Sequence, residues 1–187
     1  MKHQKLYHLV LAALFAALTA IGAFLKIQIP VEGIPAITLQ FFFTAMAGVL
    51  LGAKYGAISQ AVYVLLGLVG LPIFTMGGGF SYVLQPSFGF LVGLIPSAWV
   101  IGMLCKNAKS FWPMALGILA GLAVLYLIGT PYMGLILNLY LGKGMSVWQI
   151  VRAGCLLYLP GDVLKIVVCT ALCLALRSRL PKALAAA

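Results

Sequence analysis

Acidic residues are almost missing from this chain. Only 2 of its 187 residues are Asp or Glu, and charged residues of both signs make up 7%, whereas soluble domains carry about a quarter. Hydrophobic residues make up 64%, and the mean hydropathy is +1.16. A water-soluble fold of this size could not bury that much apolar surface. We therefore expect an integral membrane protein whose main solvent is lipid.

The usual parts of an active site are also missing. The 2 histidines, His3 and His8, both lie near the N-terminus, and the 4 cysteines form no C-x-x-C pair. A Ser–His protease, a zinc site and a pair of carboxylates for acid–base chemistry all lack their components. No nucleotide-hydrolysing motif is present. We expect no catalytic residue, no metal and no cofactor, so any active transport would draw on an ion gradient or a partner.

Apolar runs predict an all-α membrane protein with six transmembrane helices in a single domain, residues 1–187. A helix needs about 20 apolar residues to cross the hydrocarbon, and the first run resembles a signal peptide but is longer than a cleaved one usually is. A continuation of the fifth helix past Pro131 would be kinked, and Ser146 with Gln149 resembles a capping box. The predicted helices cover about residues 6–25, 37–51, 55–68, 87–105, 113–132 and 160–176.

The formal net charge of +10 comes from 12 Lys and Arg residues. They lie mostly between the apolar runs, where they contact lipid headgroups, and no basic cluster with exposed aromatics suggests nucleic-acid binding. If both termini are cytoplasmic, eight basic residues lie on that side and four elsewhere, as the positive-inside rule requires for an even number of spans. We expect a bacterial cytoplasmic (inner) membrane protein. The eight are Lys2, Lys5, Lys54, Lys106, Lys109, Arg177, Arg179 and Lys182.

Asp162 and Lys165 are the strongest functional signal in the chain. Both lie inside the last apolar run, three residues apart, so they share a helix face and can pair. Ionisable groups within a span cost about 2.5–3.5 kcal/mol each on insertion scales and usually mark a functional site. The alternative is structural, with Asp162 capping the first turn and Lys165 reaching the headgroups.

A glycine-rich segment follows the third predicted helix and is expected to be a non-helical lid loop on the outer side. Its glycines permit unusual backbone angles and close approach of main-chain N–H groups to a ligand. The aromatic, uncharged surroundings suit a small apolar-bodied ligand better than a nucleotide. The alternative is a flexible outer turn. The candidate binding residues here are Phe74, Gly77, Gly78, Gly79 and Tyr82.

Two further sets of residues are candidates. Thr38 and Gln40, at the start of the second helix, could face a pocket, or could serve as a helix cap and an interhelical hydrogen bond. Small residues four apart give the first helix a face that lets another helix approach closely. That face serves either internal packing or a docking partner, and consists of Ala12, Ala13, Ala16, Ala17 and Ala20.

Three segments together resemble the BioY family, the biotin-specific substrate-binding (S) components of energy-coupling factor transporters. The most specific is Leu159-Pro160-Gly161-Asp162-Val163-Leu164-Lys165, and the resemblance spans nearly the whole chain. One departure is Ser87-Phe88-Gly89-Phe90, where relatives more often have Thr-Gly-Gly-Tyr, which affects the details of the lid. The other two segments are Ile37-Thr38-Leu39-Gln40 and Gly70-Leu71-Pro72-Ile73-Phe74 with the triple glycine.

The resemblance implies a six-helix bundle with an outward pocket, closed by the loops after the first and third helices. It also implies a transmembrane coupling protein driven by two ATPase subunits, docked on the alanine face. Asp162 would accept from biotin's ureido N–H groups, and Lys165 would neutralise Asp162 and donate to a ligand oxygen. Gln40 and Tyr82 would add polar contacts, while Phe74 and Phe80 would pack against the bicycle.

Two other functions stay open on the residues alone. A self-sufficient, ion-coupled carrier or channel for another small solute would transport into liposomes unaided and couple ions through Asp162. A membrane assembly protein would use Asp162 and Lys165 as a structural pair and bind no small molecule. Neither accounts for three candidate segments on one side of the membrane.

Overall fold

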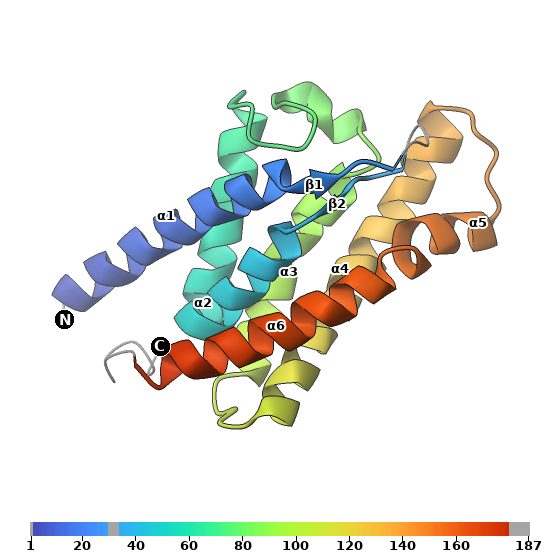
Figure 1. Cartoon of the computed structure of the whole chain (residues 1–187). Coiled ribbons are helices and arrows are strands. Elements are labelled where there is room, and N and C mark those ends of the chain that lie inside the picture. The colour runs from blue at the N-terminus through green and yellow to red at the C-terminus, as the bar shows by residue number, and fades with distance from the viewer. Residues whose placement is uncertain (1, 30–33, 180–187) are drawn as a thin grey trace.

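Helices build almost all of the structure, a computed structural model that describes residues 2–29 and 34–179 (Figure 1). Expectations that involve Glu32 or Lys182 lie outside the described residues. The main helices are α1 (Lys2–Phe24), α2 (Gln40–Leu68), α3 (Phe88–Leu104), α4 (Phe111–Leu135), α5 (Val147–Val151) and α6 (Leu159–Arg177). The helix α1 begins and α6 ends on the same side of the molecule.

The helix α2 is folded back on itself at Gly52, whose backbone angles of φ 76° and ψ 177° are not helical. Residues eight apart in a straight helix are about 12 Å apart along the axis. Here a Cβ added to Gly56 would meet the Cα of Gly48 at 2.9 Å, so the two arms lie against each other. The fold at Gly52 lies where the sequence predicts one helix to end and the next to begin.

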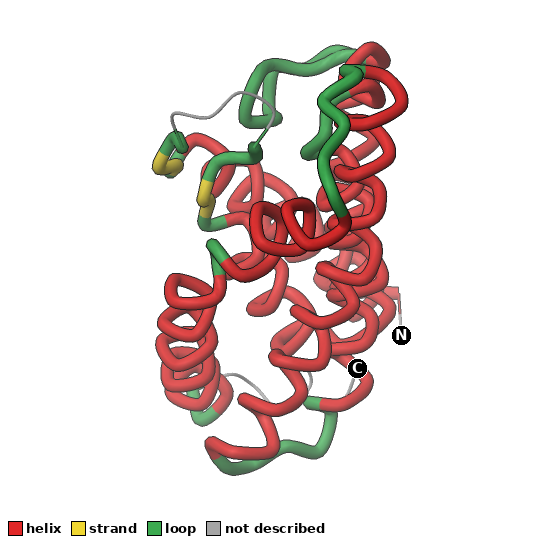
Figure 2. Tube along the Cα trace, turned by 90° about the vertical axis from the view of Figure 1, so that its right-hand side faces the viewer, coloured by secondary structure: helices red, strands yellow, loops and turns green. Residues whose placement is uncertain are grey.

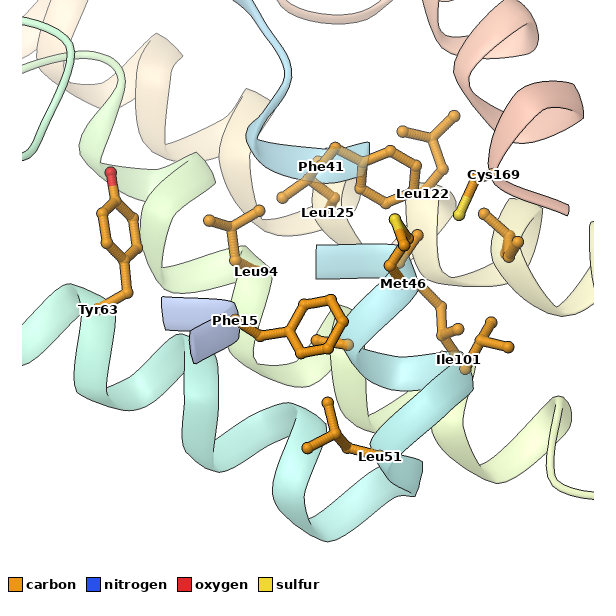
Figure 3. Packing of buried hydrophobic residues seen from close by; sticks show 14 of the residues in the cluster. Phe15, Phe41, Met46, Leu51, Tyr63, Leu94, Ile101, Leu122, Leu125 and Cys169 are labelled. Carbon is orange, nitrogen blue, oxygen red and sulfur yellow. The ribbon is translucent and has the colours of Figure 1, made fainter. Parts of the chain in front are cut away.

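Packing follows the order of the chain, with α2 between α1 and α3, α3 against α4, and α6 against α4 and α2. Close helix approach depends on glycine at a few points. A Cβ on Gly102 of α3 would lie 2.2 Å from the backbone nitrogen of Ala53, so α3 contacts the fold in α2 directly. The core cluster in Figure 3 draws on every main helix except α5, with Phe15, Phe41, Ile101, Leu122 and Cys169 among its members.

A short antiparallel ribbon crosses one end of the bundle. Strand β1 (Lys26–Ile27) pairs with β2 (Ile37–Thr38), with Lys26 opposite Thr38, and both strands lie in the upper half of Figure 2. The prediction that the second helix begins at residue 37 is wrong, because β-branched Ile37 and Thr38 find a strand partner in β1. The helix begins only at Gln40.

Other boundaries differ by a few residues from the predicted ones. The helix α4 includes Pro131 and continues into a π-helical turn, Ile136–Tyr140, since a proline inside an apolar bundle is tolerated when neighbouring groups satisfy the freed backbone. A second π-helical turn, Arg152–Leu156, links α5 to α6. The expected capping box is present, with Ser146 Oγ accepting from the Gln149 backbone and Gln149 Oε1 accepting from the Ser146 backbone. The segment after α2 is non-helical up to a 3-10 turn, Phe80–Leu84.

Four helices in the described ranges are long and apolar enough to cross a membrane, with a shorter apolar helix, Phe88–Leu104. The four segments are Lys5–Phe24, Gln40–Leu68, Phe111–Tyr140 and Val147–Arg177. This establishes a helical, multi-pass membrane protein. Because α2 folds back at Gly52, its 29 residues do not cross in one straight segment.

Candidate functional site

A cavity of about 80 Å³, open at its mouth, lies where the three candidate segments meet. Its wall combines apolar side chains with side chains that carry a polar group, as small-molecule sites do. The lining residues are Pro35, Ala36, Thr38, Gln40, Phe41, Thr75, Tyr82, Ser87, Phe90, Leu91, Leu94, Leu125, Tyr126, Tyr158, Asp162 and Lys165.

The helix α6 carries the charged part of this wall. Leu159 and Pro160 begin the helix, and proline suits the first helical positions because its missing N–H would have no partner there. Asp162 falls in the first turn, where the positive end of the helix dipole favours a carboxylate. Lys165 lies one turn further along and also faces the cavity. The sequence of α6 therefore directs one acid and one base into the same space.

Asp162 is bonded on both carboxylate oxygens. Lys165 Nζ donates to Oδ1 at 2.7 Å, and the hydroxyl of Tyr126 on α4 donates to Oδ2. The side chains of Asp162 and Lys165 are only 6% and 12% exposed. Lys165 therefore pairs with Asp162 in the cavity wall instead of extending to an exposed surface.

This arrangement leaves capacity for a ligand. A carboxylate has about four lone-pair positions, and Asp162 uses two of them on Lys165 and Tyr126. An ammonium has three donors, of which the described contact with Asp162 uses one. Hydrogen bonds to charged side chains as buried as these two are strong. The charged wall can therefore accept N–H groups from a ligand and donate to its oxygens.

Thr38 and Gln40 form the wall where β2 meets α2. Thr38 Oγ1 donates to Gln40 Oε1 at 3.0 Å, and Gln40 Nε2 donates to the hydroxyl of Tyr63 at 2.8 Å. Gln40 is 7% exposed and Tyr63 is fully buried. The two candidate residues lie at the cavity as predicted, and Tyr63 connects them to the second arm of α2.

Residues of the loop after α2 make a third polar wall. The Thr75 hydroxyl is 2.8 Å from that of Tyr82, which is 3.1 Å from the hydroxyl of Ser87. Lys26 Nζ of β1 donates to the Thr75 carbonyl at 2.5 Å, so the two loops at the mouth of the cavity are joined. Tyr82 lies where the sequence predicted a binding residue.

Most of the glycine-rich segment has a different position from the one expected. Phe74 is 1% exposed and packs between the rings of Tyr63 and Tyr82. A Cβ added to Gly67 would lie 2.0 Å from the Phe74 ring. Phe80, by contrast, is 78% exposed. Neither ring lines the cavity, so Phe74 anchors the loop to α2.

The three glycines themselves also lie outside the cavity lining. Gly77 and Gly79 have φ of +116° and +103°, which L side chains rarely adopt. The Gly79 N–H donates to the Gly67 carbonyl at 2.7 Å, and a Cβ on Gly78 would lie 2.0 Å from the carbonyl oxygen of Leu71. The glycines shape a loop packed on α2 that directs Thr75 and Tyr82 to the cavity.

The alanine face of α1 lies partly inside the bundle and partly on its surface. Ala12 and Ala16 are 2% and 4% exposed, because they pack into the bundle. Ala13 and Ala17 are exposed, and Ala20 is intermediate. The five positions lie next to one another around the helix, and burial decreases from the Ala12 edge to the Ala17 edge, so only part of the predicted face is open to a partner.

Sequence reasoning missed several lining residues. Tyr126 bonds Asp162 from 36 positions away, and no local spacing connects the two. Tyr158, whose hydroxyl donates to the Pro35 carbonyl at 2.5 Å, precedes α6 and reads in sequence as ordinary apolar bulk. A tyrosine inside an otherwise apolar run is the one available signal, because a buried hydroxyl needs a partner.

Comparison with known proteins gives consistent matches. The model of the BioY family matches residues 1–182. The "Probable biotin transporter BioY" of Lysinibacillus sphaericus is 45% identical over 148 residues, which are 78% of this chain and 74% of that protein. The "Biotin transporter BioY" of Thermotoga maritima is 37% identical over 171 residues, 90% of this chain and 95% of that protein.

A solved structure has the same fold. The S-component for biotin from an ECF-type ABC transporter superposes with a TM-score of 0.82 at 28% sequence identity, covering 95% of this chain and 94% of that one.

Proposed function

The chain belongs to the BioY family, and we propose that it captures biotin for uptake as the membrane-embedded substrate-binding subunit of an energy-coupling factor transporter. It is a transport component and not an enzyme. The relatives named as biotin transporters and the S-component that shares its fold are transport components too. The observation that carries the proposal is the buried Asp162–Lys165–Tyr126 cluster in the wall of a mostly apolar cavity.

Biotin fits the chemistry of this cavity. Its ureido ring presents two N–H donors and a carbonyl, its bicycle is apolar and contains sulfur, and its tail ends in a carboxylate. Asp162 accepts from a ureido N–H, and Lys165 neutralises Asp162 and donates to a ligand oxygen. Phe90, Leu94 and other apolar lining residues pack against the bicycle. Phe74 and the triple glycine act by holding the loop that presents Thr75 and Tyr82.

The proposed topology has six membrane crossings, counting the two arms of α2 separately. Both termini face the cytoplasm and the cavity opens outward, in the cytoplasmic (inner) membrane of a bacterium. Support comes from the distribution of basic residues and from α1 beginning and α6 ending on the same side (Figure 1). The loops after α1 and α2 form the lid, joined by Lys26 and Thr75.

The proposed partner is a transmembrane coupling protein with two ATPase subunits, which supplies the energy that this chain has no motif to harvest. Docking would use the exposed small residues of α1, Ala13 and Ala17, with Ala20 at the edge. Replacing Ala13 and Ala17 together by Leu should abolish uptake by the assembled transporter while leaving biotin binding unchanged. Loss of binding in that variant would contradict the separation of the two surfaces.

Equilibrium titration of the detergent-purified chain with biotin tests the function. We expect saturable binding, one biotin per chain. A folded chain that binds no biotin would overturn the proposal. Uptake into liposomes by this chain alone, driven by an ion gradient, would favour the self-sufficient carrier instead.

A further inference from the structure

A chain of hydrogen bonds leads from the cavity wall into the protein. Gln40 Nε2 donates to the Tyr63 hydroxyl at 2.8 Å, and that hydroxyl donates to the backbone carbonyl of Ile73 at 3.1 Å. Tyr63 does not line the cavity and is fully buried. Figure 3 shows its hydroxyl directed away from the α2 backbone, at the edge of the core cluster. This series of hydrogen bonds therefore ends on the loop after α2.

The Ile73 carbonyl, the last group in this series of hydrogen bonds, determines which group donates in each of them. The Ile73 carbonyl can only accept, so the single proton of Tyr63 is committed to it. The Tyr63 oxygen must then accept from Gln40, which requires the NH₂ end of the Gln40 amide to face Tyr63. The Ile73 carbonyl, acting through the Tyr63 hydroxyl, therefore favours one orientation of an amide whose two ends have nearly the same shape.

The reversed amide would be costly. It would direct Gln40 Oε1 at the Tyr63 oxygen. Either two acceptors would then face each other, or Tyr63 would donate to Gln40 and leave the Ile73 carbonyl without its donor. Both arrangements leave a polar group without a partner, which is unfavourable. Because the Tyr63 side chain has no exposed surface, bulk water does not relieve the conflict.

The acceptor end of Gln40 consequently lies on the side of the cavity. Oε1 accepts from the hydroxyl of Thr38 at 3.0 Å, and Thr38 and Gln40 both line the cavity. A carbonyl oxygen has two lone pairs, and Thr38 occupies one. The remaining position suits a ligand N–H.

We infer that Tyr63 is a specificity-determining positioning residue, which fixes Gln40 with its acceptor toward the cavity so that this wall selects an N–H donor on the ligand. The inference rests on the proposed function, and it assigns one of the two ureido N–H groups of biotin to Gln40. The other N–H pairs with Asp162 on α6. The cavity then has one acceptor on each of two walls for the two donors of the ring.

The probes are biotin and its two carbamate isosteres, in each of which a ring oxygen replaces one ureido N–H. Each isostere places an acceptor where biotin has a donor. In the native chain we expect both isosteres to bind at least roughly tenfold more weakly than biotin, because each one sets an acceptor against a buried acceptor.

Tyr63→Phe frees the Gln40 amide to turn while keeping the ring packed against Phe74. We expect the discrimination against one isostere to fall at least threefold in this variant, because the amide can offer its NH₂ to the ring oxygen. Discrimination against the other isostere should persist, since this variant leaves Asp162 and its contacts with Lys165 and Tyr126 unchanged.

Tyr132→Phe is the matched control. The Tyr132 hydroxyl also donates to a backbone carbonyl, that of Val83, at 2.5 Å, and the Tyr132 ring also packs on a phenylalanine, Phe88. In the described contacts, neither the hydroxyl nor the ring of Tyr132 touches Gln40. We expect discrimination against both isosteres to stay at the native level. A general loosening of the loop would affect the two variants alike.

The outcomes separate this inference from the function. If the folded native chain does not bind biotin, the proposed function falls and this inference with it. If the native chain binds biotin and Tyr63→Phe keeps the native ratio for both isosteres, only the role of Tyr63 is overturned. Should Tyr63→Phe not fold, Gln40→Met replaces the test: it should lose the discrimination against one isostere, and retained discrimination would overturn the inference.

Discussion

The two ends of α6 both carry charged side chains, and these charges are satisfied in a different way at each end. At the start, Asp162 and Lys165 pair beside an open cavity and keep unused hydrogen-bonding positions. At the end, Arg177 donates to three backbone carbonyls, those of Cys105 at 2.9 Å, Ala108 at 3.1 Å and Val49 at 2.5 Å.

Those three carbonyls explain the role of Arg177. Cys105 is the C-cap residue just after α3, and Val49 lies just before the fold at Gly52 in α2. Carbonyls at such helix ends lack intrahelical partners. A guanidinium also suits the negative end of a helix dipole. Arg177 therefore joins three parts of the chain. A charge bonded to backbone carbonyls therefore holds the fold, whereas a charge that borders a cavity and keeps unused hydrogen-bonding positions is available to a ligand.

The largest effect on binding is expected at the cavity end. Asp162→Asn leaves a side chain of the same shape but removes the charge that pairs with Lys165. We expect biotin affinity to fall by at least about 2 kcal/mol, roughly thirtyfold, the scale for losing a buried charged partner. Equilibrium binding measures it, and near-native affinity would remove Asp162 from the site.

At the other end of α6, replacing Arg177 should lower the stability of the fold. Arg177→Met keeps a long apolar side chain and leaves the three carbonyls without their donor. We expect the free energy of unfolding to fall by about 1–3 kcal/mol, while the folded fraction binds biotin with native affinity. Thermal unfolding in detergent reads the loss. Lys106→Gln, an exposed basic residue at the end of α3, is the matched control and should change neither quantity.

A smaller effect is expected at Tyr126. Tyr126→Phe removes the hydroxyl that donates to Asp162 and keeps the ring. We expect biotin affinity to fall by about 0.5–1.5 kcal/mol, the net contribution of one hydrogen bond, with less loss than in Asp162→Asn. A titration series of the two single variants and the double variant would reveal coupling. Independent, additive losses would contradict a direct role of Tyr126 in holding the carboxylate.

Local spacing predicted the features that are local in the chain. Asp162 and Lys165 are three apart on one helix, the Ser146–Gln149 capping box spans one turn, and the break around Gly52 separates two apolar runs. Each depends on neighbours within a few residues, so periodicity and residue chemistry suffice. The meeting of the three polar segments in one cavity also followed, because their shared side of the membrane could be inferred from the basic residues.

Features that depend on long-range packing could not be predicted. Tyr126 and Arg177 act on partners 36 or more positions away, and sequence spacing says nothing about such pairs. Phe74 is an anchor and not a cavity residue because Gly67, on another element, leaves room for its ring. Ala12 is buried and Ala13 exposed because of the rotational orientation of α1 against α2, which tertiary packing determines.

Thermal unfolding of three proteins, each with and without saturating biotin, distinguishes the binding end of α6 from its structural end. A ligand that binds only the folded state raises its stability. We predict that native protein and Arg177→Met both gain stability on adding biotin, with Arg177→Met starting from a lower midpoint, and that Asp162→Asn gains little. If Asp162→Asn gains as much as native protein, or if Arg177→Met loses the gain, the division between a binding end and a structural end of α6 is contradicted.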